Sequence, residues 1–272
     1  MPPQMHRISV THPVPDSACA AVAAGAGISK GAAKRAMNQG AVWLQRGRRK
    51  MQRLRRATSA LRPGDLLLFY HDPAILALSP PAARCEKDCR DYSIWFKPAG
   101  LLTQGTRFGD HCALLRQVER HFNGRRPALP VHRLDREAAG LVLVAHHSKA
   151  AARLSDLLRF RAIVKTYRIQ VLGRLGDRGA TGSIDLALDG KAAGTDYTVL
   201  EYDPHTDRTT ARIILQTGRL HQIRRHLAAI GHPVMGDSRY GQGNRHPDGL
   251  QLVADRLAFD CPFGHGPIDI AI

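Results

Sequence analysis

Acidic residues, aromatic residues and long apolar runs are all scarce in this chain of 272 residues. Asp and Glu number 23 against 40 Lys and Arg, giving a formal net charge of +17, and aromatic residues make up 6%. No stretch approaches the roughly 18 consecutive apolar residues of a membrane-spanning helix, and the segment Ala18–Ile28 is too weakly apolar for a signal-peptide core. We therefore expect a cytoplasmic protein without a membrane span.

The excess of positive charge predicts a polyanionic partner. A field of this sign attracts nucleic acid first and an anionic membrane surface second. With 43% hydrophobic residues, the chain can bury a full core and hold one large domain plus a small one.

Cysteines and histidines give no sign of a metal site. The five cysteines form an odd set without a regular framework, which suits free thiols in a reducing compartment. Cys85 and Cys89 are spaced at the loose end of zinc-ligand patterns and no second pair follows, so we interpret them as loop thiols. The 14 histidines are scattered and form no His-Glu-x-x-His signature. We therefore expect no metal, and the absence of a Gly-rich phosphate loop likewise fits a protein without an organic cofactor.

The first region of the chain combines short elements with a dense run of positive charge. Ser29 is suited to cap a helix through about Gln39, which Gly40 would end. Strands are expected at Ala41–Leu44 and Leu66–Tyr70, the latter after a turn at 62–65. The basic segment between them contains Arg46, Arg48, Arg49, Lys50, Arg53, Arg55 and Arg56. Such close like charges repel one another, so we interpret this segment as facing RNA phosphates, the alternative being a solvated charge run.

Three short motifs in this region resemble the small S4-like RNA-binding module: Ile28-Ser29-Lys30, Gly40-Ala41-Val42 and Pro63-Gly64-Asp65. The match is partial, because Trp43-Leu44-Gln45 replaces the usual residues after the glycine. The resemblance implies a small α/β module within residues 1–72, starting near residue 15. The Pro/Ala/Ser-containing stretch 73–90 then reads as a linker, and 91–272 as a second domain.

Strands and helices alternate in the second region. Strands are expected at Tyr92–Phe96, Gly140–His146, Ile163–Leu172, Asp196–Tyr202 and Thr209–Leu215. Helices are expected from Ser148 to about Phe160 and from Leu220 to a stop at Gly231. Many strands and few helices predict an α+β domain with a mixed, largely antiparallel sheet and flanking helices.

Polar residues gather in three islands of this second region: His132-Arg133-Leu134-Asp135-Arg136, Lys165-Thr166-Tyr167-Arg168, and the segment 218–226, which opens the last predicted helix. Taken alone, an Asp between two arginines is more often a structural salt bridge than a reactive group. The start of a helix that also carries arginines is, however, a ready anion site.

The order and spacing of these islands resemble the RluA family of pseudouridine synthases. The resemblance covers nearly all of 91–272: the turn at 97–101 matches the first family motif, 131–141 the second, Lys165-x-Tyr167 the third, and 218–224 the fourth. The chain departs from the pattern at Ala138-Ala139, where Thr-Ser is usual, and at Leu220, where Thr is usual. The resemblance implies a pseudouridine synthase-like fold and the isomerisation of uridine in structured RNA.

The resemblance also implies roles for three residues. Asp135 would act as the nucleophile, or as a base toward the ribose in the competing glycal scheme. Arg219 would hold the Asp135 carboxylate ionised and oriented. Tyr167 would lie against the base and is a candidate to remove the proton from ring carbon 5, the alternative being a core tyrosine.

Further residues are expected to contact RNA. Arg133 resembles the residue that fills the gap left by a flipped-out uridine. His132 is either an RNA contact or structural, and Lys97 either contacts the RNA backbone or steadies the pocket. The remaining RNA-binding candidates of the second region are Lys165, His221 and Arg224.

We expect a monomer that acts on ribosomal RNA, most simply that of the large subunit, with transfer RNA as the alternative. A catalytically silent RNA-binding or assembly protein with the same fold would share the positive charge but would not need Asp135. A DNA-binding protein is disfavoured because no helix-turn-helix or zinc-finger pattern is present.

Overall fold

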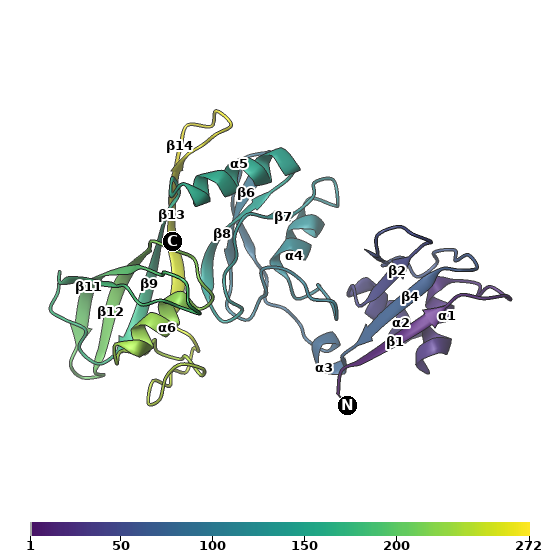
Figure 1. Ribbon diagram of the computed structural model, residues 1–272, viewed down its shortest axis with the longest axis horizontal. Helices are drawn as coiled ribbons and strands as arrows, with labels where there is room; N and C mark the ends of the chain where they lie inside the picture. Colours follow the sequence, from purple (N-terminus) through teal and green to yellow (C-terminus); the bar gives the residue numbers. More distant parts are fainter. Residues whose placement is uncertain (1) are drawn as a thin grey trace. The chain divides into compact units, whose positions relative to one another are not determined.

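The computed structural model describes residues 2–272, which form two compact units (Figure 1). Unit 1 comprises the described residues through Pro81 together with Gln104–His121, and unit 2 comprises Ala82–Thr103 and Phe122–Ile272. No helix within residues 2–272 combines the length and apolar character that crossing a bilayer requires.

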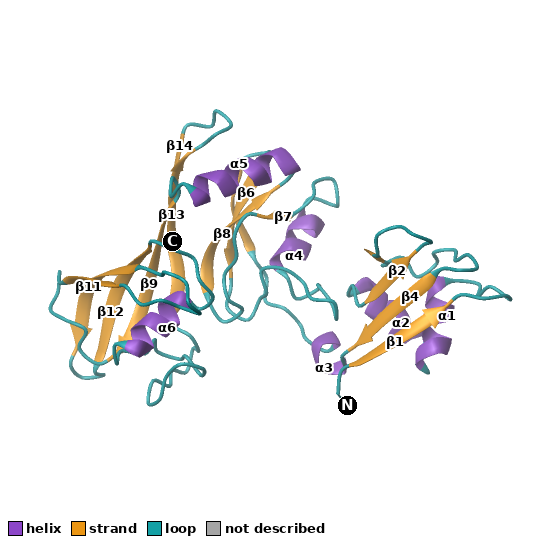
Figure 2. Ribbon diagram, in the orientation of Figure 1, coloured by secondary structure: helices purple, strands orange, loops and turns teal. Residues whose placement is uncertain are grey.

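Unit 1 contains a four-stranded antiparallel sheet in the order β1-β4-β2-β3. Its strands are β1 (Gln4–Ser9), β2 (Val42–Gln45), β3 (Gln52–Arg53) and β4 (Leu66–His71). Its helices are α1 (Ala18–Ala26), α2 (Lys30–Asn38), α3 (Pro73–Leu76) and α4 (Leu114–His121). Figure 2 shows α1 and α2 beside the sheet formed by β1, β4 and β2.

Side-chain caps and small residues explain the two leading helices of unit 1. Ser17 and Ser29 each accept a hydrogen bond from a backbone N–H in the first turn of α1 and α2. Alanine-rich faces then let both helices pack closely on Leu67 and Phe69 of β4, both fully buried. The expected helix after Ser29 and the strands near Ala41 and Leu66 are thus confirmed, whereas β1 and α1 were not expected.

Unit 2 is built on a ten-stranded sheet whose main path runs β10-β11-β12-β9-β13-β8-β6-β5, with β14 beside β13 and β7 beside β8. The strands on one side are β9 (Val164–Leu172), β10 (Thr181–Ile184), β11 (Thr195–Asp203) and β12 (Arg208–Leu215). The others are β5 (Arg84–Asp88), β6 (Tyr92–Lys97), β7 (Leu129–Pro130), β8 (Ala139–Ala145), β13 (Leu252–Asp260) and β14 (Pro267–Ala271). Among the described strands of this sheet only the β8–β13 pair is parallel, so the predicted mixed, largely antiparallel sheet is confirmed.

Two helices accompany this sheet, α5 (Ser148–Arg159) and α6 (Gln222–Ala229) (Figure 2). Ala150 and Leu154 of α5 pack on the apolar residues of β6, β8 and β13 in one buried cluster. His147, rather than the expected Ser148, is the capping residue of α5, because its Nδ1 accepts the Ala150 N–H. The α6 helix begins two residues later than the expected start at Leu220.

Gly140 lies where β8 approaches the backbone of β13 closely. Its φ is +121°, and a Cβ at this position would lie 2.3 Å from the Ala254 carbonyl oxygen and 2.4 Å from the Ala254 nitrogen. A side chain is therefore excluded by the neighbouring backbone. This approach matters for the site, because β8 follows the loop that carries Asp135.

The structure corrects the expected linker at 73–90. Part of that stretch forms α3, and Arg84–Asp88 forms β5, which pairs with β6 as an edge strand of the large sheet. Cys85 consequently lies in a strand rather than in a loop. A strand forms where side chains alternate between the two faces of a sheet, whatever the overall composition. Because β5 carries charges of both signs, this alternation was not recognised in the sequence.

Candidate active site

Thr103 and Lys97 form hydrogen bonds with the backbone of the loop that carries Asp135. The Thr103 hydroxyl donates to the Leu134 carbonyl at 2.9 Å and accepts the Leu134 N–H at 3.0 Å. The Lys97 ammonium donates to two carbonyls that follow Asp135 in the loop, those of Ala138 at 2.6 Å and Arg136 at 3.4 Å. These bonds hold the backbone at Asp135 in place whichever way its carboxylate is turned.

Lys97 is wholly buried, so its expected contact with the RNA backbone is wrong and its other expected role, support of the pocket, fits the geometry. Besides the two carbonyls beside Asp135, its ammonium donates to those of Leu101 and Pro98 at 2.8 and 3.0 Å. Burial lowers the pKa of Lys97 to about 8, although the charges of Asp135 and Glu137 act in the opposite direction.

Gln222 shapes the turn that leads into α6. Its side-chain oxygen accepts hydrogen bonds from the Thr217 hydroxyl at 2.6 Å and the Arg219 N–H at 2.9 Å. Its amide nitrogen donates to the Gly194 carbonyl at 2.8 Å and lies 3.0 Å from the Thr195 hydroxyl. Gln222 thus fixes the 217–219 turn against β11, a role that the sequence motif contained but did not reveal.

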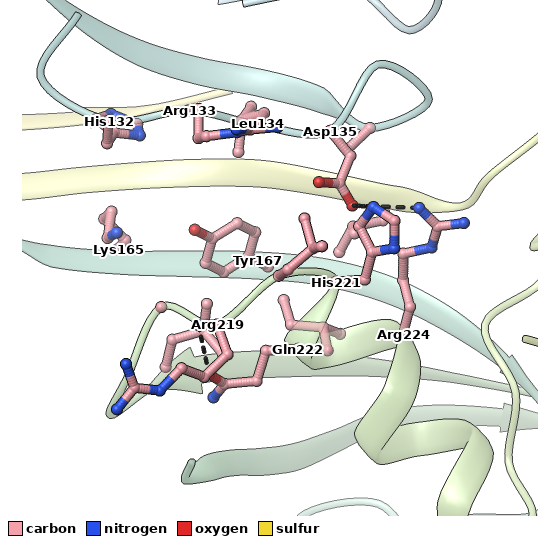
Figure 3. Close-up of a pocket in the computed structure, with 16 residues that line it drawn as sticks. His132, Arg133, Leu134, Asp135, Lys165, Tyr167, Arg219, His221, Gln222 and Arg224 are labelled. Atoms are coloured by element: carbon pink, nitrogen blue, oxygen red, sulfur yellow. Dashed lines mark hydrogen bonds and ion pairs between the residues drawn. The ribbon is translucent and has the colours of Figure 1, made fainter. Parts of the chain in front are cut away.

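Arg224, not Arg219, is the guanidinium beside Asp135. Its Nη1 lies 3.2 Å from Asp135 Oδ2, and its Nε and Nη2 form a two-point ion pair with Asp237 at 2.7 and 2.9 Å. Burial alone would lower the pKa of Arg224, but hydrogen bonds and charges of Asp237 and Asp135 raise it instead. A permanently charged arginine, anchored by a buried carboxylate, therefore faces Asp135 (Figure 3).

The expected Arg219–Asp135 pair is wrong because Arg219 belongs to the turn before α6. Its Nε donates to the Ala192 carbonyl at 3.1 Å, and its guanidinium points away from Asp135 (Figure 3). Arg219 is exposed at the rim of the pocket. It can therefore contact the phosphates or sugar of a ligand.

His221, the residue before α6, also lies near the Asp135 carboxylate. Its backbone is left-handed, with φ +52°, and its Nε2 lies 3.7 Å from Asp135 Oδ2. Its Nδ1 lies 2.9 Å from the hydroxyl of Tyr240. Burial lowers the pKa of His221, and Arg224 acts in the same direction while Asp135 opposes it. One Asp135 oxygen, Oδ2, therefore faces both Arg224 and His221.

Tyr167 and Lys165 project from the same face of β9, because they are two residues apart in a strand. Tyr167 is 6% exposed and lines the cavity below Asp135. Burial, and then the charge of Asp135, raise the pKa of Tyr167, so its phenol stays protonated while Asp135 is ionised.

The end of the cavity away from Arg224 is formed by Lys165 and His132 (Figure 3). His132 Nε2 accepts the Leu143 N–H at 3.1 Å, and burial lowers the pKa of His132 to about 3. The ring is therefore neutral and carries its proton on Nδ1, which is buried without a partner among the described residues. Burial lowers the pKa of Lys165.

Asp135 and the side chains that face it, together with Lys165 and His132, line one cavity of about 450 Å³, enough for a nucleoside base and sugar. It unites the expected site residues Asp135, Tyr167, His132, Arg133 and Lys165 with the 218–224 turn. Within residues 2–272, no group of three or more His, Cys, Asp or Glu side chains is arranged to hold a metal ion.

The basic segment of unit 1 divides into paired and exposed residues. Arg46 forms a two-point ion pair with buried Asp65, at 2.9 and 3.0 Å, and its assignment as an RNA contact stays a prediction. Arg53 and Arg55 both pair with Asp110. This carboxylate offsets part of their positive charge within the unit, which reduces their mutual repulsion. Arg48, Arg49 and Lys50 remain exposed in the connection between β2 and β3.

Known RNA-modifying proteins resemble this chain over the residues that form the cavity. The family model for RNA pseudouridylate synthase matches residues 91–229. The dual-specificity RNA pseudouridine synthase RluA of Haemophilus ducreyi is 34% identical over 193 residues, covering 64% of this chain and 82% of that protein. The ribosomal large subunit pseudouridine synthase D of Nitrosomonas europaea is 35% identical over 175 residues, covering 58% and 49%. The chain therefore belongs to the RluA family of RNA pseudouridine synthases.

Two solved structures show the same fold. The human RNA pseudouridylate synthase domain containing 1 superposes with a TM-score of 0.60 at 22% identity, covering 72% of this chain and 86% of that one. The human domain containing 4 protein gives 0.56 at 21% identity, covering 70% and 87%. Among curated relatives, an RNA pseudouridine synthase of Chloroflexus aurantiacus is 32% identical over 70% of this chain. The chain spans 58–67% of the length of the first three such relatives.

Proposed function

We propose that the protein isomerises uridine to pseudouridine in structured RNA, with Asp135 as the reacting carboxylate. The observation that carries this proposal is the arrangement of Asp135: it lines a base-sized cavity and is partly accessible, with Arg224 on one oxygen and Tyr167 below it. Membership of the family supports the same reaction.

The reaction breaks the bond between ribose carbon 1′ and uracil nitrogen 1, turns the base within the pocket, and rejoins it through ring carbon 5. Arg224 orients the Asp135 carboxylate, either for attack on carbon 1′ or for action as a base toward the ribose. Tyr167 offers a flat face to the base. If Asp135 forms an ester, its negative charge disappears, and with it one of the two causes that hold the Tyr167 phenol protonated. Its role as base at carbon 5 then becomes available.

The RNA surrounding the uridine must be gripped while the base is extruded, at a cost of about a few kcal/mol. We assign this task in unit 2 to Arg133 and Arg219, which lie exposed at the rim of the cavity. In unit 1, the exposed residues Arg48, Arg49 and Lys50 are suited to bind phosphates. The S4-like identity of unit 1 stays part of this proposal.

Large-subunit ribosomal RNA is the substrate we favour, because one of the relatives is named a ribosomal large subunit enzyme. Another is named dual-specificity, which keeps transfer RNA as the alternative. The protein is proposed to act as a cytoplasmic monomer.

The test uses ribosomal and transfer RNA transcripts carrying tritium at carbon 5 of uridine. The wild-type protein should release tritium into water from one of them, and Asp135→Asn should release none. Asp156→Asn, which changes an exposed aspartate on α5, is the matched control and should retain full activity. Equal release by wild type and Asp135→Asn would refute the assignment of Asp135. No release from any RNA would favour a silent RNA-binding protein.

A further inference from the structure

Two hydrogen-bond donors at one end of the cavity have no partner. The Lys165 ammonium makes no hydrogen bond or ion pair with any residue in 2–272, and burial is the one cause that shifts its pKa. Beside it, the Nδ1–H of His132 is buried and equally unpaired. Lys165 is half-buried and the His132 nitrogen is fully buried. Buried polar groups are almost always satisfied in folded proteins, so two adjacent unpaired donors lining one cavity call for an explanation.

An unpaired, half-buried ammonium destabilises the free protein because it has lost part of its water without gaining a counter-charge. The carboxylate that lines the same cavity does not compensate it, since Asp135 is already bound to Arg224. The arrangement therefore suits a ligand that brings negative charge and acceptor oxygens to this end of the cavity (Figure 3).

The proposed reaction generates such a species. When the bond from carbon 1′ to nitrogen 1 breaks, its electron pair leaves with the base, and uracil becomes a monoanion whose charge spreads over the ring and its two carbonyl oxygens. This holds whether carbon 1′ bonds to an Asp135 oxygen or carbon 2′ loses a proton to Asp135. The anion then uses carbon 5 to form the new bond to carbon 1′. In the ester route the carboxylate is released again, and in the glycal route Asp135 returns its proton to carbon 2′; afterwards, in both routes, carbon 5 loses its proton and nitrogen 1 gains one.

We propose that Lys165, with the Nδ1–H of His132, holds the detached uracil anion at the end of the cavity opposite Arg224 while the base turns. This inference rests on the proposed function and assigns two RNA-binding candidates to the base itself rather than to phosphates. A fixed ammonium in a cavity shielded from water stabilises developing charge more strongly than it would in solution. Tyr167, which lies between Lys165 and Asp135 in Figure 3, would face the ring as it turns.

The experiment compares Lys165→Met and Lys165→Arg with wild type under single-turnover conditions at saturating protein. Lys165→Met should slow tritium release at least tenfold while changing RNA affinity less than threefold, because the affinity comes mainly from phosphate contacts. Lys165→Arg, which keeps the charge, should recover part of the rate. Lys149→Met removes an exposed lysine of α5 and should match wild type.

Two further readouts separate this role from a structural one. The unfolding midpoint of Lys165→Met should equal or exceed that of wild type, since an unpaired, half-buried charge has been removed. The rate defect should also shrink on RNA with 5-fluorouridine at the target, followed as consumption of that nucleotide, because fluorine makes uracil a better leaving group.

A Lys165→Met protein as fast as wild type would overturn the inference and leave the proposed function standing. The same holds for a defect of equal size on both nucleotides, or one explained entirely by weaker RNA binding or a lower unfolding midpoint. Absence of tritium release by the wild type would overturn both proposals.

Discussion

Replacing Arg224 by Met should lower both the stability and the activity of the protein, through two different carboxylates. The Asp237 side chain is completely buried, and Arg224 is its ion-pair partner at 2.7 Å. Removing one member of a buried pair leaves an uncompensated charge, which costs about 3–5 kcal/mol. Asp135 is partly exposed, so its loss of the same guanidinium should affect reactivity far more than folding.

Arg219→Met is the matched control, because it removes the same side chain five residues away. Arg219 is exposed and donates one hydrogen bond to a backbone carbonyl. Its replacement should cost no more than about 1 kcal/mol of stability and should act mainly by weakening RNA binding.

Adding Asp237→Asn to Arg224→Met removes the orphaned carboxylate and separates the two effects. The double variant should recover part of the lost stability but not the activity, because Asp135 still lacks its cation. Urea unfolding followed by circular dichroism measures stability, and single-turnover tritium release measures activity. Arg219→Met destabilising the protein as much as Arg224→Met, or a fully active double variant, would refute this reasoning.

Three further perturbations test the scaffold of the site. Lys97→Met removes a donor from four carbonyls, and for those of Leu101 and Ala138 the lost hydrogen bond is buried, so urea unfolding should register a loss of about 3 kcal/mol; an unchanged midpoint would contradict its supporting role. Gly140→Ala forces a methyl group into the Ala254 backbone and should cost about 2–5 kcal/mol by the same measurement. Burial opposes ionisation of Asp237, but hydrogen bonds, first from Arg224, outweigh it and lower the pKa. This stabilisation is present above the unfolded pKa near 3.8 and is lost as pH falls toward the folded value; Asp237→Asn should therefore flatten the acid side of a stability–pH curve.

Local elements of the fold were predictable where one short-range interaction decides them. The helix after Ser29 begins where a hydroxyl can cap it, and the apolar run from Gly140 forms the buried strand β8. The central strand β13 was not predicted. Asp255 and Arg256 interrupt its apolar pattern, and its parallel pairing with β8 joins residues more than 100 positions apart. Pairing of this kind is decided by the surrounding sheet.

The ion-pair partners of charged side chains likewise depend on the tertiary structure rather than on local sequence. Arg219 and Arg224 belong to one motif, and the sequence does not say which of them reaches Asp135. Residues three apart share a helix face, so Arg224 lies on the same side as His221 at the start of α6 and both face the carboxylate. Arg219 precedes that helix, and the Gln222 bonds turn it away. Likewise, Arg55 pairs with Asp110, which lies 55 positions further along the chain. The sequence alone therefore made the arginines of the basic segment appear unpaired.

The sequence by itself determined that a basic chain carries Asp135 between arginines in a motif typical of one RNA-modifying family, because charge and local motifs are properties of residue order. The tertiary structure alone decided that Arg224 holds Asp135, that Lys97 is buried beneath it, and that Lys165 is left without a partner among residues 2–272. Hydrogen bonds and ion pairs act over about 3 Å, and only folding brings such distant parts of the chain within that range.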